Sequence, residues 1–407
     1  MLQNWIKLVL LTLVVISCSP EVKDPNALTG KVDVDALVKA NNEVGFSLLS
    51  TLDTAWKNVL ISPYSIQSAM EMTLQGALNK TKTQLITGLS LGSLTPADVA
   101  ASYPEWDGLM KGGPGATRFR SYNTLFYDPN RLTLDDQFRQ VMTNAFEAPY
   151  LNLDFDQSTA VDEVNQWVKD KTEGKIDKII DQITDDDVLI LLNALTLSGD
   201  WLYPFPVEST FDQDFHLPTG SAISVPMMHL DWNLIHERND QGAMVQLPLK
   251  DSNYAVMFVL PLADPVQSPI AWHQAVKSMF AGFISQSHQP SRALLTIPKL
   301  ELGYKVLLNE PFKTLGMEDP FDPQTADFSG LGVSGKGNLF IRRVDHRTYL
   351  KMDEKGIDGA AVTSVSIGAT SLPPAYVFDH SFALIVYHLP TGTIVFDGVI
   401  HDPEEKG

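Results

Sequence analysis

The chain has 407 residues, of which 44% are hydrophobic and 19% charged, so it can bury a large core and is too apolar for a disordered protein. Its 49 acidic and 30 basic residues give a formal net charge of −19, which argues against a nucleic-acid-binding protein because phosphate binding needs a basic surface. With a single cysteine, the chain can form no internal disulfide.

The N-terminus has the pattern of a secretory signal peptide, with an apolar run over residues 8–17 that is too short for a stable membrane-spanning helix. The sole cysteine, Cys18, follows in the sequence VISC, which resembles a bacterial lipobox. The alternative is an ordinary signal peptide with a chance cysteine. We predict a lipoprotein signal peptide over 1–17 and a lipidated N-terminus with its tether over 18–33.

Acyl chains such as palmitate on Cys18 would anchor the protein to a membrane of the bacterial cell envelope without threading it through the bilayer. Ser19 after this cysteine favours the outer membrane, by resemblance to common lipoprotein rules. The face, periplasm or exterior, stays open.

Helices dominate the first half of the folded chain. Apolar spacing near 3.6 predicts helices over 34–53 and 159–175. A buried helix over 62–78 begins at Ser62, with Pro63 at its first position. The nearly continuous apolar run within 186–201 indicates a strand buried on both faces.

Strands dominate the second half, and the class is α+β. The patterns predict four of them: 254–261, 293–302, 382–389 and 392–400. The last two are expected to form a hairpin through the sequence PTG. We predict one folded domain over 34–403, followed by a short tail over 404–407.

Catalytic signatures are missing from the sequence: there is no G-x-S-x-G, no H-E-x-x-H and no phosphate-binding loop. Four histidines that could hold a metal show no ligand spacing: His216, His229, His236 and His380. The sequence therefore predicts a protein that is not an enzyme and needs neither cofactor nor metal.

An ordered set of motifs covers the folded chain. They are NVLISPYSI (58–66), VNQWVKDKTEGKI (164–176), LLNALTLSGDWLYPF (191–205), TFDQDF (210–215), VPMMHL (225–230), IPKLELGYKVLLNEPFKTLGMEDPFDPQTADFSGL (297–331), VDHRTYLKMDEKGIDGAAV (344–362) and DHSFALIVYHLPTGTIVFDGVIHDP (379–403). In this order they resemble the serpin family over residues 36–403.

The resemblance implies a fold with three β-sheets, eight to nine helices and an exposed reactive centre loop, here about 354–378. It implies a monomeric suicide-substrate inhibitor, whose partner is a target serine protease, with a cysteine protease left open. After cleavage, the loop of such a protein inserts into the central sheet as a new strand.

The residues of the predicted loop suit such an insertion. No charged residue occurs from Gly359 to Phe378. One side of a strand built from this segment would be apolar or small, and the other mostly polar or small. The apolar side would consist of Ile357, Gly359, Ala361, Thr363, Val365, Ile367 and Ala369. Pro373 and Pro374 cannot donate to a ladder, so the strand must end before them. The alternative is an ordinary edge strand followed by a proline turn.

Two counts along the family pattern place the cut bond at Thr370–Ser371. One starts from the hinge glutamate, Glu354, and the other from the position before Phe382. A small β-branched residue before the bond favours elastase-like or subtilisin-like proteases. Ile367 and Ala369 remain alternative positions.

Further site residues follow from the resemblance alone. The hinge would comprise Glu354, Gly356, Ile357, Gly359, Ala360 and Ala361. The breach, where the loop enters the sheet, would comprise Trp201, Lys299 and Glu354, the last two as an ion pair. The shutter, a polar cluster under the sheet, would comprise Ser62, Ser65, Asn193 and His346.

Two hinge residues depart from the family pattern. Ile357 stands where Thr or Ser is usual, and Gly359 where Ala is usual. A bulky Ile357 gains burial energy if its site fits, but slows insertion if the site is tight. The alternative function is therefore a non-inhibitory serpin that acts as a binding or carrier protein.

Overall fold

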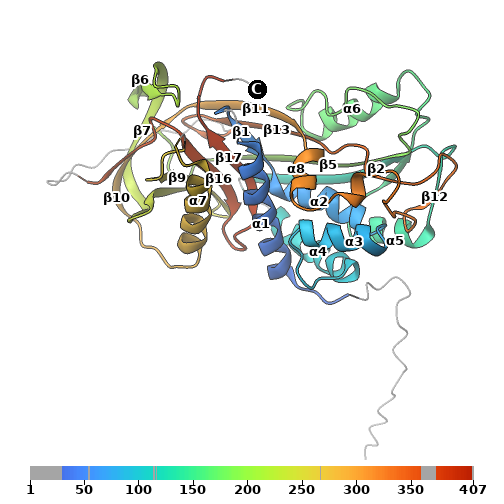
Figure 1. The fold of residues 1–407 in the computed structure, drawn as a ribbon. Coiled ribbons are helices and arrows are strands. Elements are labelled where there is room, and N and C mark those ends of the chain that lie inside the picture. The colour runs from blue at the N-terminus through green and yellow to red at the C-terminus, as the bar shows by residue number, and fades with distance from the viewer. Residues whose placement is uncertain are drawn as a thin grey trace, which may run out of the picture.

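The structure is a computed structural model that describes residues 30–53, 56–112, 115, 117–265, 267–358 and 373–405 (Figure 1). Within these ranges eight α-helices occur, six of them in the first half of the chain, as expected. Their bounds are α1 Val34–Leu52, α2 Pro63–Leu74, α3 Asn79–Gly88, α4 Pro96–Lys111, α5 Asp136–Asn144, α6 Ala160–Lys171, α7 Pro269–Ile284 and α8 Asn309–Thr314. Two short 3-10 helices are Val207–Ser209 and Asp319–Phe321.

The start of α2 shows why the sequence signal was reliable there. The Ser62 hydroxyl accepts a hydrogen bond from the Ser65 N–H at 3.3 Å, and Pro63 follows at the first helical position. Both features reduce the number of unpaired backbone N–H groups in the first turn of α2. The Ser62 hydroxyl accepts from one of them, and proline has no N–H at a position where it would lack a partner.

A six-stranded sheet extends along the longest dimension of the molecule. Its order is β11 Leu300–Leu307, β13 Asp345–Met352, β14 Gly356–Ile357, β5 Leu189–Asp200, β2 Arg118–Tyr127 and β4 Tyr150–Asn152. The helix α6 covers one face of this sheet and packs on its own apolar cluster, whereas α2 packs against β5 from the other face (Figure 1).

A nine-stranded arrangement contains the remaining long strands. Its order is β1 Val59–Ile61, β17 Ile394–Ile400, β16 Phe382–His388, β9 Tyr254–Pro261, β8 Gly242–Pro248, β7 Ala222–Arg238, β10 Ser291–Pro298 and β15 Ala375–Val377, with β6 Thr210–His216 on β7. Because 222–234 of β7 pair with β6 and β10, and 235–238 with β8, this strand joins two sheets. With the central sheet they make the expected three; β3 Leu132–Leu134 and β12 Gly332–Ser334 form a separate pair.

The hairpin predicted at the end of the chain is confirmed, since β16 and β17 pair antiparallel. The single strand predicted over 293–302 is wrong. The chain forms β10 up to Pro298 and then enters β11, which belongs to a different sheet. Proline has no N–H for a ladder, and Lys299 N donates instead to Pro226 O at 3.0 Å. No helix in the described part of the chain is long and apolar enough to cross a membrane.

Candidate functional site

The start of the predicted loop already forms part of the central sheet. Ile357 pairs with Met352 of β13 on one side and with Gly199 of β5 on the other. Its side chain is only 1% exposed, so the bulky residue fits the core. Burial of such a side chain contributes about 1.5–3 kcal/mol.

Gly356, the other residue of β14, occupies a position where no side chain fits. A Cβ at this position would lie 2.1 Å from the carbonyl oxygen of Gly199 and 2.7 Å from Cα of Asp200. The close approach of two backbones explains the need for glycine where the chain enters the sheet.

The tight turn between β13 and β14 is held by the expected breach residue Trp201. Its indole N–H donates to Asp353 O at 2.8 Å and its backbone N–H donates to Lys355 O at 2.7 Å. Phe205 N donates to Glu354 O at 2.9 Å. Three donors from the segment after β5 therefore fix the point at which the chain turns into the sheet.

The predicted ion pair is present: Lys299 Nζ lies 2.6 Å from Glu354 Oε1. The Glu354 side chain is 8% exposed and that of Lys299 37%. Burial raises the pKa of Glu354, but the hydrogen bond from Lys299 opposes it and the net result is a lowered pKa. The carboxylate therefore stays ionised at the entrance of the sheet.

Two of the expected shutter residues, Ser62 and His346, contact each other through one backbone group. Ser62 N donates to His346 Nε2 at 3.0 Å. Burial lowers the pKa of His346 to about 3. The imidazole is therefore neutral, with Nε2 as the acceptor.

The other two shutter residues, Ser65 and Asn193, meet weakly, since the Ser65 hydroxyl donates to Asn193 O at 3.4 Å. The Asn193 side chain faces β2 instead, where it donates to Ser121 Oγ and to Asn123 Oδ1, both at 2.8 Å. Ser121 and Asn123 were missed in the sequence. The signal for them was the alternation of polar residues within an apolar strand.

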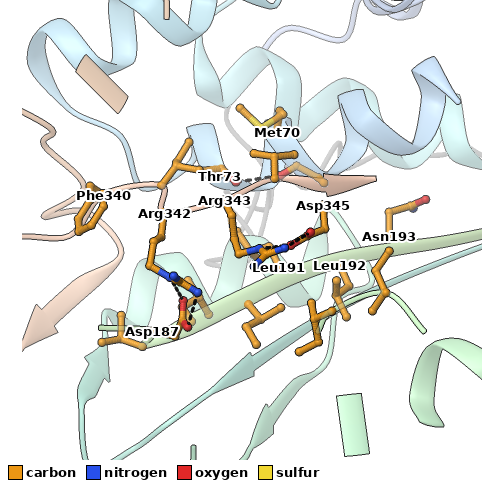
Figure 2. Close-up of a pocket in the computed structure, with 18 of the residues that line it drawn as sticks. Met70, Thr73, Asp187, Leu191, Leu192, Asn193, Phe340, Arg342, Arg343 and Asp345 are labelled. Carbon is orange, nitrogen blue, oxygen red and sulfur yellow. Dashed lines mark hydrogen bonds and ion pairs between the residues drawn. The ribbon is translucent and has the colours of Figure 1, made fainter. Parts of the chain in front are cut away.

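A cavity of about 180 Å³ separates β5 from the chain that leads into β13 (Figure 2). Its walls include Leu191 and Asn193 on one side and residues 341–347 on the other. In the described strands, the ladder partners of β13 are β11 and β14, and those of β5 are β14 and β2. Beyond the short β14, the residues that the structure describes therefore leave a slot between β5 and β13.

Ion pairs surround the far end of this slot. Arg342 binds Asp187 through two hydrogen bonds of 2.6 and 2.8 Å, and Arg343 pairs with Asp345 (Figure 2). A bidentate arginine–carboxylate contact has a defined geometry. It bridges the two chain segments beyond the open part of the sheet.

The chain re-enters the described range at Pro373 and is anchored far from β14. There, β15 pairs in parallel with β10 at the edge of the nine-stranded arrangement. Arg238 donates to Ala375 O at 2.9 Å, and the hydroxyl of Tyr376 lies 2.8 Å from His236 Nδ1. The ends of the predicted loop are therefore fixed in two different sheets.

Several predicted residues lie outside the described ranges. They are the cut bond Thr370–Ser371, the hinge residues Gly359, Ala360 and Ala361, and the lipidation residue Cys18.

A Ser–His–Asp array that the sequence did not reveal lies at the ends of β16, β17 and α1. Ser381 Oγ is 2.8 Å from His401 Nδ1, and His401 Nε2 is 3.0 Å from Asp53 Oδ1. A second imidazole, His273 Nε2, lies 3.0 Å from Asp53 Oδ2. Ser381 and His401 are both buried. The hydroxyl also faces Nδ1, whereas a catalytic serine faces Nε2, so the geometry fits a structural network better than a nucleophile.

Three carboxylates come close together elsewhere, in Asp128, Asp154 and Asp156. The guanidinium of Arg131 lies 3.1 Å from Asp128 Oδ2 and also pairs with Asp156. The arginine thus supplies the positive charge that a metal ion would otherwise provide.

Two relatives match this chain over most of its length and over most of their own. Iripin-8 of Ixodes ricinus is 30% identical over 90% of this chain and 93% of its own. Corticosteroid-binding globulin of Ovis aries is 30% identical over 91% of this chain and 86% of its own.

Among solved structures, the native state of the thermophilic serpin tengpin superimposes with a TM-score of 0.82 at 27% identity. The match covers 92% of this chain and 96% of that one. The family described as "Serpin (serine protease inhibitor)" matches residues 39–403. With the sheet order and the anchored loop ends, these matches show that the chain belongs to the serpin family.

Proposed function

We propose that this serpin inhibits serine proteases as a suicide substrate whose cleaved loop inserts into the central sheet. The observation that carries the proposal is the slot between β5 and β13. β14 already occupies the end of this slot that lies beside the last residues of β5. A strand added there would satisfy backbone groups on both sides and bury its apolar face.

The ladder register supports the proposal. If β14 is extended in the same register, Asp358 lies opposite Ser198 and Ile367 opposite Leu189, the first residue of β5. In this register, β5 offers ladder partners to residues 358–367, which cover much of the alternating uncharged segment. Both Pro373 and Pro374 stay outside it.

The proposed cut bond is Thr370–Ser371. No Arg or Lys occurs between Gly356 and Phe378, which disfavours a trypsin-like target. Threonine before the bond suits a protease with a modest specificity pocket, of the elastase or subtilisin type.

The first experiment mixes the protein with elastase- and subtilisin-type proteases and resolves the products on denaturing gels. We expect a covalent adduct that carries the protease, together with a cut at Thr370–Ser371 found by mass spectrometry. Cleavage without an adduct to any protease would rule out the inhibitory mechanism.

A matched pair of loop variants tests insertion itself. Thr363→Arg places a charge on the face that would enter the core, and burial of an unpaired charge is very unfavourable. Ser364→Arg places the same charge on the opposite face. We expect the first variant to be cleaved without an adduct and the second to retain the adduct.

The second candidate is a binding or carrier protein, favoured by the 30% identity to corticosteroid-binding globulin. The Ile357 side chain that motivated this alternative is buried without difficulty, which favours insertion instead. A carrier would show ligand-dependent stabilisation and no adduct.

The location proposed for this inhibitor is the bacterial envelope, with a lipid anchor on Cys18. The support is the lipobox-like sequence VISC. Expression with an alkyne-labelled palmitate should label the protein, and Cys18→Ser should abolish the label and release the protein from the membrane fraction.

A further inference from the structure

Asp358, the residue that follows β14, has an unusual backbone conformation. Ile357 is the last residue of β14, and Asp358 has a φ of 52°. This left-handed region is unfavourable for residues other than glycine, although aspartate and asparagine enter it more readily than most. A contact that stabilises this conformation would therefore decide where β14 ends.

Asp358 has such a contact with Lys175, in the segment that follows α6. Its Oδ2 lies 2.6 Å from Lys175 Nζ, and the two side chains are 19% and 20% exposed. The pair is thus shielded from solvent more than most surface ion pairs, so salt screens it less.

Lys175 is held in place by the end of α6. Its backbone N–H donates to Thr172 O at 3.1 Å, and Gly174 N donates to Lys169 O at 2.8 Å. The Thr172 hydroxyl also accepts from Ile176 N at 3.1 Å. The backbone that carries the Lys175 side chain is therefore fixed by the hydrogen-bonded turn after α6.

Extension of β14 by one residue would change this contact. Asp358 would have to rotate from the left-handed region to an extended conformation in order to pair with Ser198 and Lys351. Its present backbone bond to Lys351 O is long, at 3.4 Å. The Lys175 contact is formed while Asp358 is in the left-handed conformation, so extension of β14 must give up the backbone arrangement in which the contact forms.

We propose that Lys175 and Asp358 form a latch that stops β14 after Ile357 and sets the rate at which the sheet takes up further strand. The latch rests on the proposed function, because it concerns the same insertion. It makes Lys175, which lies just after α6 and far from the proposed cut bond in the sequence, a positioning residue for inhibition.

The test measures strand uptake without any protease. The intact protein is incubated with a synthetic peptide of residues 359–372, and uptake is followed as the growth of a heat-stable species on native gels. Lys175→Ala should take up the peptide about two- to fivefold faster than the original protein, the range expected for loss of one partly exposed ion pair. Asp358→Asn should do the same, because asparagine tolerates the left-handed backbone and removes only the charge.

Matched variants separate the latch from general loosening. Lys178→Ala removes a lysine of the same segment, whose partner is Asp181 at 3.1 Å, and should leave the rate unchanged. Lys175→Arg should keep the slow rate, and the exchange of both charges in Lys175→Asp with Asp358→Lys should restore it.

An unchanged or slower rate in Lys175→Ala would overturn the latch while leaving the proposed inhibitory function intact. Failure of the original protein and of every variant to take up peptide would instead count against strand insertion, and with it against both proposals.

Discussion

Asp397 is a buried acid in the middle of β17, between Ile61 of β1 and Ile385 of β16 in the ladder. Burial raises its pKa to about 8, with the Gly398 N–H opposing this weakly. The native protein therefore keeps this proton between about pH 4 and pH 8, whereas the unfolded chain releases it near pH 4. The free energy of unfolding accordingly falls as the pH rises through this window.

Asp397→Asn removes this titration and should stabilise the protein at neutral pH. The upper limit of the gain at pH 7 is about 4 kcal/mol, at roughly 1.4 kcal/mol for each pH unit above the unfolded pKa. Thermal midpoints at pH 5 and pH 7.5 should lie closer together in the variant. Asp240→Asn, at an exposed position, serves as the control, and an equal narrowing in this control would contradict the assignment.

At the scale of elements, Asp53 joins the end of α1 to α7 through His273, and to the chain just after β17 through His401. Burial raises the pKa of Asp53, but the hydrogen bonds from the two imidazoles outweigh it and lower the pKa to about 2. Because the folded pKa lies below the unfolded value, this contribution to stability is present above about pH 4 and lost as the pH falls toward 2.

Asp53→Asn should therefore lower the free energy of unfolding by roughly 2 kcal/mol at pH 6, and by much less at pH 2.5. Urea unfolding at the two pH values measures the difference. Asp35→Asn, an exposed change within α1, serves as the control and should not reproduce this difference between the two pH values. A loss that is equally large at both pH values would indicate a packing defect instead of a lost charge.

At the scale of the whole molecule, the described residues leave one strand position between β5 and β13 of the central sheet unfilled. Cleavage of the loop should let the cut segment fill the slot and raise the thermal midpoint by more than about 10 °C. The estimate assumes that several buried apolar side chains contribute about 1.5–3 kcal/mol each, and that 1 kcal/mol shifts the midpoint of a sizeable domain by roughly 2–4 °C.

Limited proteolysis followed by calorimetry measures this shift. A cleaved protein that melts at the same temperature as the intact one would favour the carrier alternative. The Thr363→Arg variant should lose most of the gain after cleavage, which ties the effect to burial of the inward face.

The sequence by itself determined α1, α2, α6 and the closing hairpin, because each depends on local pattern, whereas α4 and α7 were not predicted and the breach followed only from the resemblance to the serpin family. The start of α2 at Ser62 is an example of a local pattern, and the pair of Lys299 with Glu354 is an example of what the resemblance implied. The sequence failed at Pro298, where one apolar run divides between two sheets, since alternation is the same for either partner strand.

Only the tertiary structure decided how far the loop has entered the sheet. The alternating residues indicate that the segment can become a strand, but the pairing of Ile357 with Gly199 and the contact of Asp358 with Lys175 join residues that are distant in sequence. The same holds for Asn123 beside Asn193 and for Asp53 beside His401. Such pairs form between segments that are distant in the sequence, and a single sequence carries no local signal for them.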